Sequence, residues 1–514
     1  MKKIITTLLL LVSLQLTAQT SKWSEDVANI IYNNCSTCHR SGNIAPFVLE
    51  SYADAVTWAS MIKTVVDNGS MPPWQADPAF SRHAHERLLT PIEIQKIGDW
   101  VTNGTPLGDV SVAPSFPNFT EGSSLSAIDF TARMPDYSSV ATTADEYRCF
   151  VVPTGITTDR FIQELEIVPG NRGVVHHVLV FGDNSGEASV LDAASPGPGY
   201  PCYGDAGTSN TTLLGLWAPG SEPQKLPDGF GIKLAANSDV ILQLHYPSGA
   251  LGSLDSSRVN FKFATASARE VRLDPILNHS TNISSTLIIP ANTTPTFTEN
   301  FTLPGINMTL FAVAPHMHLI GKNIKTYAIP PTGDTIRLNN IKNWDFHWQG
   351  MYFYPKALKI PANSTLRAIA EYDNTADNPF NPTSPPALVT LGEATTDEMM
   401  LVFFLWTLYT PGDEAIVIDN NLPNLGVTSI ADNTPILPLE VYPNPASNQL
   451  FINLPNTISH YKISVTDAAG RCIINRVETN IGAGYTSIEN VSPGVYTIQL
   501  SNHQKVWQSK FVVN

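Results

Sequence analysis

The chain has 514 residues, a length that accommodates about three domains. It carries 30 Lys and Arg residues against 45 Asp and Glu, a formal net charge of −15, and no basic cluster offsets this excess. Nucleic acid and anionic membrane surfaces are therefore excluded as partners. Only 15% of the residues are charged while Pro (39) and Gly (32) are abundant, a composition typical of exported all-β proteins with many turns.

Residues 1–18 contain the parts of a signal peptide in order: two lysines, an apolar run and a small-residue cleavage site. We expect the mature chain to begin at Gln19. No later stretch approaches the roughly 18 uninterrupted apolar residues of a membrane span, since the longest candidate, 399–409, has eleven. The sequence thus predicts export without a membrane span.

The segment from Cys35 through Cys38 to His39 is C-x-x-C-H, the c-type haem attachment sequence. In it, two thiols bond to the haem vinyl groups and the adjacent imidazole becomes an axial iron ligand. A redox dithiol and half a zinc site are the alternatives. Helix signals surround the motif, including an N-cap, an N1 proline and a capping-box Glu over 90–93. We predict a small all-α cytochrome c-like haem domain over 20–110.

The predicted sixth ligand of this haem is Met71, which lies in a loop stiffened by Pro72 and Pro73. A thioether opposite an imidazole gives the raised potential of an electron carrier. The alternative for Met71 is a core methionine. His83 and His85 compete for the role, although we expect both at the surface.

From about residue 145 the pattern changes to β-runs separated by Pro and Gly turns, which favours β-sandwiches. One run carries His176 and His177 among Val and Leu residues. Successive strand side chains point to opposite faces, so a purely structural strand rarely places two imidazoles side by side. Another run carries His245, which alone would be expected to be a packed core or edge histidine. Together the three could bind one metal ion.

A third run contains His316 and His318, an H-x-H spacing that sends both imidazoles to one face of a strand. Downstream, Met399 opens an apolar run. A methionine in that position is usually a core residue. As a ligand it would be informative, because a thioether suits Cu(I) whereas zinc favours His, Cys and carboxylates.

The order of these motifs, H-H, L-H-Y, H-x-H and D-E-M, resembles the copper type II, ascorbate-dependent monooxygenases, which include the peptidylglycine α-hydroxylating and dopamine β-monooxygenases. The resemblance covers roughly residues 130–420. It implies two β-sandwich domains, 125–270 and 271–420, each holding one copper ion across a solvent-exposed cleft.

The resemblance also assigns the ligands. An electron-transfer copper would be held by His176, His177 and His245. The copper that binds dioxygen would be held by the catalytic residues His316, His318 and Met399. Met400 is an alternative thioether, but the match at 397–399 favours its neighbour.

Further expectations follow from the resemblance. Gln243 shares a strand face with His245 and is either a hydrogen-bond partner that orients this ligand or a plain core amide. Cys149 and Cys202 are the only thiols of the first sandwich, and because the family is disulfide-rich in this domain we expect them to be bridged.

The chain departs from the peptide-hydroxylating members at their substrate anchors. Their Arg before H-x-H, and their Asn and Tyr after the Met ligand, correspond here to Ala314, Leu401 and Phe403. An anionic peptide terminus is therefore disfavoured, and an apolar or aromatic substrate is expected. For the nearby aromatic cluster and its histidine we favour packing over substrate contact: Trp344, Phe346, His347, Trp348, Tyr352 and Phe353.

After a linker over 421–439, residues 440–514 read as a small Ig-like β-sandwich. The segments YPNPA, SPGVYTIQL and KFVV resemble the C-terminal sorting domain of the Bacteroidetes type IX secretion system. An ordinary adhesive module is the alternative. The resemblance implies transfer through the periplasm and the type IX machinery to the cell surface or the medium.

The predicted fold is mainly β, with two tandem sandwiches between a small α-domain and a sorting sandwich. The predicted function is a secreted dicopper monooxygenase that hydroxylates an aliphatic C–H of a small organic substrate with O2. Its cofactors would be two copper ions and one covalent haem, with electrons from ascorbate, another external donor or the haem itself. The alternative is a secreted copper and haem electron-transfer or metal-binding protein without hydroxylase activity.

Overall fold

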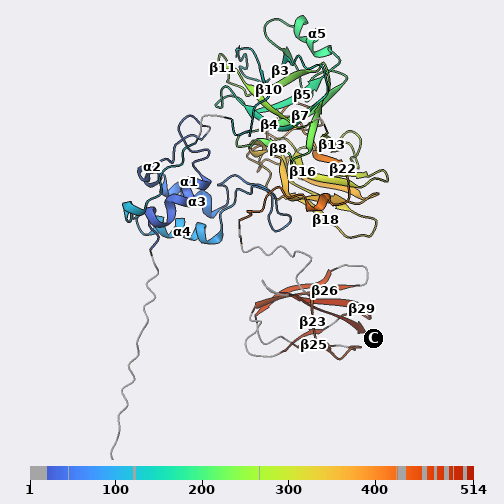
Figure 1. Cartoon of the computed structure of the whole chain (residues 1–514). Helices are drawn as coiled ribbons and strands as arrows, with labels where there is room; N and C mark the ends of the chain where they lie inside the picture. The colour runs from blue at the N-terminus through green and yellow to red at the C-terminus, as the bar shows by residue number, and fades with distance from the viewer. Residues whose placement is uncertain are drawn as a thin grey trace, which may run out of the picture. The chain divides into compact units, whose positions relative to one another are not determined.

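The structure is a computed structural model, and the residues it describes are 20–43, 45–119, 123–265, 267–423, 425, 436–447, 449–453, 460–467, 472–479, 485–489, 491–501 and 506–514. The predicted signal peptide and most of the predicted linker lie outside these residues. The chain divides into two compact units, 1–425 and 426–514, which are described separately (Figure 1).

The first unit begins with a helical module, as the sequence predicts. Thr90 accepts a hydrogen bond from the Glu93 backbone while the Glu93 carboxylate accepts one from the Thr90 backbone, so the capping box is confirmed. Trp23 and Trp100 pack at the centre of the module. Its elements are η1 (Trp23–Val27), α1 (Ala28–Asn34), α2 (Tyr52–Thr57), α3 (Ala59–Asp67), α4 (Pro91–Thr102) and η2 (Val110–Val112).

The first β-sandwich packs a sheet of order β6-β3-β10-β5-β7 against one half of a longer sheet. Phe150 and Leu242 of one layer meet Ile232 and Phe261 of the other in a shared core. Its elements are β1 (Phe130–Arg133), β2 (Tyr137–Ser138), β3 (Glu146–Pro153), β4 (Arg160–Val168), β5 (His177–Asp183), α5 (Glu187–Ala194), β6 (Tyr200–Pro201), β7 (Thr211–Trp217), β8 (Gln224–Lys225), β9 (Phe230–Leu234), β10 (Asp239–Tyr246), β11 (Leu254–Asp255) and β12 (Arg258–Phe263).

The second β-sandwich packs a sheet of order β15-β20-β17-β18 against the other half of the longer sheet. Ile324 and Leu366 meet Val313 and Phe404 in its core. Its elements are β14 (Ile288–Ile289), β15 (Thr296–Thr302), β16 (Met308–His316), β17 (Gly321–Ile329), β18 (Ile336–Ile341), η3 (Phe346–Trp348), β19 (Tyr352–Ile360), β20 (Thr365–Tyr372), β21 (Val389–Thr390), β22 (Leu401–Leu408) and η4 (Asp413–Ala415).

The longer sheet runs through both sandwiches in the order β1-β12-β4-β9-β13-β22-β16-β19. Its central strand, β13 (Arg269–Asn278), pairs in parallel with β9 over residues 269–271 and antiparallel with β22 over residues 272–278. The predicted boundary between residues 270 and 271 therefore falls inside a strand that both sandwiches share.

Residues 72–88, between α3 and α4, leave the helical module and run along the second sandwich; we call them the strap. Ala76 forms an antiparallel bridge with Ile341 of β18. The Asp77 N–H donates to the Asn340 carbonyl (2.8 Å), and the Ala84 N–H donates to the Phe353 carbonyl (2.7 Å). The strap is thus hydrogen-bonded to edge strands of both layers of the second sandwich.

The strap overturns one expectation. His83 is 0% exposed, with its ring centroid 5.3 Å from that of Tyr352 and 5.4 Å from that of Tyr354. The expectation that His83 lies at the surface is therefore wrong, because the strap buries it against the second sandwich. His85 is exposed, as expected.

The second unit is a small β-sandwich, as the sequence predicts. Its sheets have the orders β23-β30-β29-β26-β27 and β24-β25-β28, and Ile452 and Ile498 lie in the core between them. Its strands are β23 (Ile436–Pro438), β24 (Val441–Tyr442), β25 (Gln449–Asn453), β26 (His460–Asp467), β27 (Cys472–Thr479), β28 (Tyr485–Glu489), β29 (Gly494–Ser501) and β30 (Val506–Val513).

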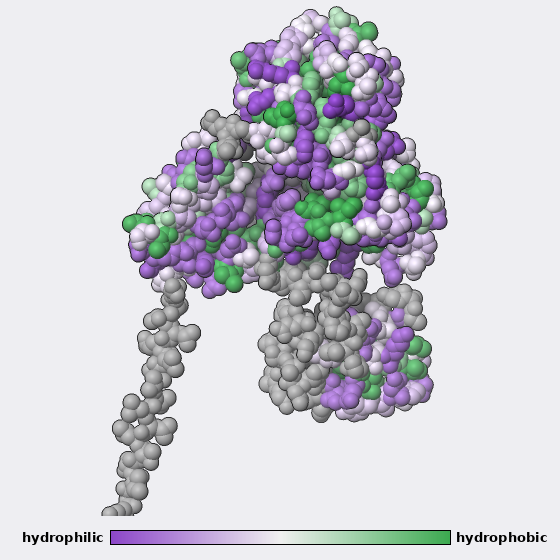
Figure 2. Space-filling model, viewed as in Figure 1, coloured by the Kyte–Doolittle hydropathy of each residue, from purple (hydrophilic) through white to green (hydrophobic). Residues whose placement is uncertain are grey.

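The hydropathy of the described residues characterises both the surface and the helices. On the face seen in Figure 2, hydrophilic side chains cover most of the described surface, and hydrophobic ones form small separate patches. Among the described residues, no helix combines the length and the apolar character needed to cross a membrane.

One buried carboxylate links the start of the shared strand to β16, two strands away in the longer sheet. Asp413 accepts hydrogen bonds from Arg269 at the start of β13 (2.7 and 3.0 Å) and from Thr309 in β16 (2.6 Å). Burial alone would raise the pKa of Asp413, but the hydrogen bonds from Arg269, Thr309 and the Thr410 backbone outweigh burial and hold this pKa at about 2.

We expect Asp413 to make stability depend on acid pH. Its folded pKa lies below its unfolded value, so its contribution is complete above about pH 4 and is lost as the pH falls toward about 2. Asp413→Asn should lower the free energy of unfolding by about 2 kcal/mol at pH 6 and by about half as much at pH 3, measured by urea unfolding. Asp136→Asn, at an exposed ion pair, is the control and should change little at either pH. An Asp413 effect equal at both pH values would contradict this expectation.

Candidate metal centre

Three histidines of the first sandwich, His176, His177 and His245, converge and form what we call the first set. In the register of the sheet, His177 of β5 lies opposite His245 of β10. The Nδ1 atom of His177 is 3.4 Å from Nδ1 of His176 and 3.2 Å from Nδ1 of His245. One ligand atom from each of the three rings lies within 4.8 Å of the others. This spacing suits a single metal ion held by three imidazoles.

The neighbours His176 and His177 reach the same site because the strand begins between them. The sequence predicts a strand that includes both, whereas β5 starts only at His177. His176 lies just before the strand, where its N–H donates to the His245 carbonyl (2.9 Å). The alternation of strand side chains therefore does not separate the two imidazoles.

His245 is oriented by Asp145, a residue that the motifs do not indicate. Nε2 of His245 lies 3.0 Å from Oδ2 of Asp145, so Nε2–H is the donor and Nδ1 is left for a metal. The ring of Tyr147 stacks on that of His245 at 4.3 Å. The hydrogen bond from His245 outweighs burial and holds the pKa of Asp145 at about 2.

Asp145 also reaches the second sandwich, because its Oδ2 accepts a hydrogen bond from Thr395 (3.1 Å). Asp145 and His245 are 100 positions apart in the sequence. No local pattern could therefore have paired them; only the strand register does.

Gln243 lies on the expected strand face but bonds elsewhere. Its Nε2 donates to the Asp205 carbonyl (2.7 Å) and lies 3.5 Å from Sγ of Cys202. Cys149 and Cys202 form a disulfide with a Cα–Cα distance of 5.9 Å, which confirms the expected bridge. The described contacts of Gln243 thus fix the disulfide region, while Asp145 orients His245.

Residues His316, His318 and Met399 of the second sandwich form what we call the second set. The ring centroids of His316 and His318 are 5.1 Å apart, so H-x-H places both imidazoles together. Nδ1 of His316 lies 2.5 Å from Oε1 of Gln349, and Nδ1 of His318 lies 3.1 Å from the Asp397 carbonyl. Both rings therefore keep Nε2 for a metal.

The thioether alternatives separate clearly. Met399 is 6% exposed and lines the cavity described below, whereas Met400 is 0% exposed and packs in the core of the second sandwich. The buried Glu398 carboxylate accepts hydrogen bonds from the backbone N–H groups of His318 (2.9 Å) and Met399 (3.1 Å). One carboxylate thus fixes the backbone at both ends of the second set.

Burial favours the neutral form of four ligand imidazoles, those of His176, His177, His316 and His318. It lowers the pKa of His176 and of His318 to about 3 and that of His316 to about 4. Burial also holds the pKa of His177 well below its usual value. Neutral imidazole is the form that binds a metal, so the donor atoms of both sets fit copper.

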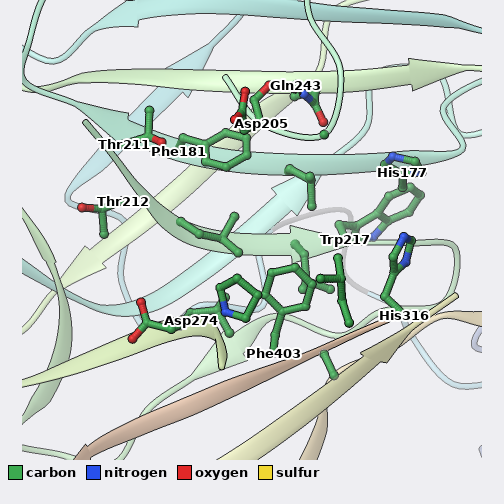
Figure 3. A pocket seen from close by; sticks show the side chains of 18 of the residues that line it. His177, Phe181, Asp205, Thr211, Thr212, Trp217, Gln243, Asp274, His316 and Phe403 are labelled. Carbon is green, nitrogen blue, oxygen red and sulfur yellow. Dashed lines mark hydrogen bonds between the residues drawn. The ribbon is translucent and has the colours of Figure 1, made fainter. Parts of the chain in front are cut away.

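His176 and His177 of the first set and all three residues of the second set line one cavity of about 730 Å³. Figure 3 shows His177 and His316 at the same end of this cavity, on strands of different sandwiches. Between the sets lies Phe346, whose ring centroid is 5.3 Å from that of His176 and 5.9 Å from that of His318. A single aromatic ring therefore bridges the two sets.

The wall of the cavity includes the three residues that replace the polar substrate anchors. Ala314, Leu401 and Phe403 all line it. In the aromatic cluster, Trp344 and Tyr352 pack in the core of the second sandwich, as favoured, whereas Phe346 and His347 line the cavity.

The haem motif lies in the helical module with free thiols. Burial raises the pKa of the Cys35 thiol to about 12. Nδ1 of His39 lies 3.1 Å from the Phe47 carbonyl, which leaves Nε2 for an iron. Met71 follows α3, where its N–H donates to the Val65 carbonyl (3.0 Å), and its ligand role stays a prediction.

A known protein resembles part of the chain in sequence. Tyramine beta-hydroxylase from Caenorhabditis briggsae is 24% identical over 276 residues, which cover 50% of this chain and 43% of that protein. The match thus spans less than half the length of this relative.

Solved structures resemble the chain only weakly. Beta-glucuronidase from Lactobacillus rhamnosus has 10% identity, covers 44% of this chain and 36% of that chain, and gives a TM-score of 0.11. PNGase F, a glycosylasparaginase from Flavobacterium meningosepticum, has 11% identity, covers 57% and 98% respectively, and gives a TM-score of 0.25. At these TM-scores neither likeness informs the fold or the function.

Models of known protein families match most of the chain. Residues 440–514 match the secretion system C-terminal sorting domain, which indicates type IX secretion to the cell surface or the exterior. Residues 130–251 match the N-terminal domain, and residues 276–416 the C-terminal domain, of the copper type II ascorbate-dependent monooxygenases. The central part of this chain, which carries both sets of ligands, therefore belongs to the copper type II ascorbate-dependent monooxygenase family.

Proposed function

We propose that the protein is a secreted dicopper monooxygenase that hydroxylates an aliphatic C–H of a small apolar or aromatic substrate. The observation that carries this proposal is that His176 and His177, which cluster with His245, line the same cavity as His316, His318 and Met399. The first set offers three imidazoles and suits one-electron transfer. The second set offers two imidazoles and a thioether, and suits a copper with an open position.

The reaction converts R–H, O2, two electrons and two protons into R–OH and water. When bound, the two Cu(I) ions supply these electrons, one each. The protein's own residues orient the ligands: Asp145 holds the His245 ring, Gln349 holds the His316 ring, and Glu398 holds the backbone beside His318. The buried ring of Phe346 lies between the sets.

The substrate class is argued from the cavity walls. Ala314, Leu401 and Phe403 provide apolar surface beside the second set, whereas the cations that line the cavity, Lys233 and Arg272, lie on β9 and β13. The name of the relative, tyramine beta-hydroxylase, denotes action on an aromatic amine, which is consistent with an aromatic substrate. A product screen with aromatic and aliphatic amines and alcohols would identify the preferred compound.

We further propose that the helical module binds a c-type haem through Cys35, Cys38 and His39, with Met71 as sixth ligand, and passes electrons to the first set. Burial raises the pKa of the Cys38 thiol, and the guanidinium groups of Arg87, Arg40 and Arg172 oppose this rise. Arg172 precedes His176 in the same loop. The Cys38 thiol therefore lies close enough to the segment leading into the first set to interact with its charge. The haem would supplement or replace an ascorbate-type donor.

The second set can be tested with matched methionine variants. We expect Met399→Leu to lower product formation by about tenfold or more, because the thioether is lost while the volume is kept. Met400→Leu, in the adjacent core, should retain wild-type turnover. Copper stoichiometry, O2 consumption and product yield would be measured on the purified protein. Equal product formation by Met399→Leu and wild type would contradict the ligand role of Met399, whereas no product from any substrate would favour an electron-transfer or metal-binding protein.

The first set depends on Asp145. We expect Asp145→Ala to weaken copper binding at this set by about tenfold, because His245 loses the partner that fixes its ring orientation. Thr395→Val removes only the hydrogen bond to Asp145 from the second sandwich and should have a smaller effect. Competition with a chelator measures the copper affinity of each variant and of the wild type. Wild-type affinity in Asp145→Ala would disprove the orienting role.

The haem proposal has a spectroscopic and a kinetic test. The wild-type protein should retain haem after denaturation, and the double variant Cys35→Ala, Cys38→Ala should not. With a donor that reduces the haem, the double variant should hydroxylate more slowly than wild type, whereas ascorbate should support both. If the variant hydroxylated as fast as wild type with every donor tried, electron transfer from the haem would be ruled out.

A further inference from the structure

The second set is covered by a loop over 344–349, which we call the site loop. Gln349 contacts His316 through the hydrogen bond described above, and Trp344 donates from Nε1 to the His318 carbonyl (3.1 Å). Phe346 lies between the two sets. The position of this loop therefore determines the orientation of the His316 ring and the separation of the sets.

The site loop is held from outside by one side chain of the strap. Nε2 of Gln75 donates to the carbonyls of Asp345 (2.8 Å) and Trp348 (2.9 Å). Oε1 of Gln75 accepts from the Asp345 N–H (3.2 Å). One amide thus satisfies backbone groups at both ends of η3, although Gln75 and Trp348 are 273 positions apart in the sequence.

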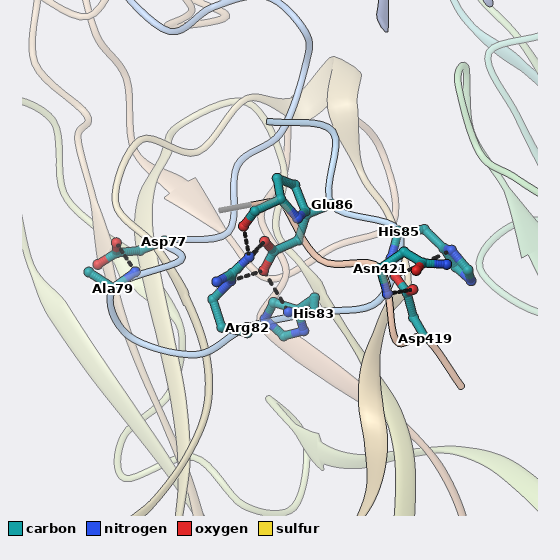
Figure 4. A network of polar contacts seen from close by, with 9 residues as sticks. Asp77, Ala79, Arg82, His83, His85, Glu86, Asp419 and Asn421 are labelled. Carbon is teal, nitrogen blue, oxygen red and sulfur yellow. Dashed lines mark hydrogen bonds and ion pairs between the residues drawn. The ribbon is translucent and has the colours of Figure 1, made fainter. Parts of the chain in front are cut away.

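The strap that carries Gln75 is itself anchored beyond this contact. Figure 4 shows Arg82, which binds the Glu86 carboxylate and donates to the Pro423 carbonyl (2.8 Å). Glu86 also accepts from the His83 N–H (2.7 Å), and Arg87 donates to the Gly220 carbonyl of the first sandwich. With the bridge at Ala76, these contacts fix the strap on the C-terminal side of Gln75.

We propose that Gln75 is a positioning residue of the second set, acting through the site loop on His316 and Phe346. The helical module then has a role besides binding the proposed haem, because its strap holds the site loop in place beside the cavity. This inference rests on the proposed function, because it assumes that the second set binds copper. The strap also contacts both sandwiches, so a displacement of the helical module would reach the second set through Gln75.

The test separates the two sites. In a His245→Ala background, which leaves the second set intact, Gln75→Ala should lower the Cu(I) affinity about tenfold in chelator competition. Gln75→Glu should do the same, because a carboxylate cannot donate to the two carbonyls. In a His318→Ala background, which leaves the first set intact, neither change should alter the affinity. Gln95→Ala, an exposed glutamine of the same module, is the matched control.

Amide hydrogen exchange gives a readout that does not need copper. In Gln75→Ala, the backbone amides of 344–350 should exchange faster, while those of β10 should be unchanged. The proposal is overturned if Gln75→Ala matches Gln95→Ala in both measurements, or if it weakens both sites equally. If the wild-type second set binds no copper, the proposed function fails, and unchanged exchange of the site loop would then also reject the role of Gln75.

Discussion

Strand β13 is the constraint on which the metal centre depends. It pairs with β9 of one sandwich and with β22 of the other, so a continuous ladder of backbone hydrogen bonds crosses the junction. The two sandwiches cannot move apart as separate bodies without breaking this ladder. His177 and His316 therefore face one cavity although they belong to different sandwiches. Arg269, paired with Asp413, fixes the start of the shared strand.

Each ligand ring with a described partner is fixed through the nitrogen that faces away from the metal position. A carboxylate does this for His245, a side-chain amide for His316 and a backbone carbonyl for His318. These partners lie 33 to 100 positions away in the sequence. The site is therefore a product of the tertiary fold, and the strap adds a contact from a third part of the chain.

The sequence is sufficient for what depends on local spacing. The capping box at Thr90 and the H-x-H pair follow from short-range patterns, the preference for Met399 over Met400 follows from the family resemblance, and the structure agrees with each. Asp145 and Gln75 could not be identified in this way, because they meet their partners across 100 and 270 positions. The burial of His83 was missed for the same reason, since solvent exposure is decided by the surface against which a loop packs.

The two sets present opposite ring nitrogens, and this has a mechanical consequence. Nδ1 of an imidazole is bonded to the ring carbon that joins Cβ, so a small rotation about the Cα–Cβ bond moves it little. Nε2 lies at the far edge of the ring and sweeps a wider arc. The Nδ1 atoms of the first set are therefore stiffly tied to their strands, whereas the Nε2 atoms of the second set are compliant. A stiff site keeps its ligand positions when the charge of a bound metal ion changes. A compliant site can adjust its metal–ligand distances as a further molecule binds to the metal and reacts.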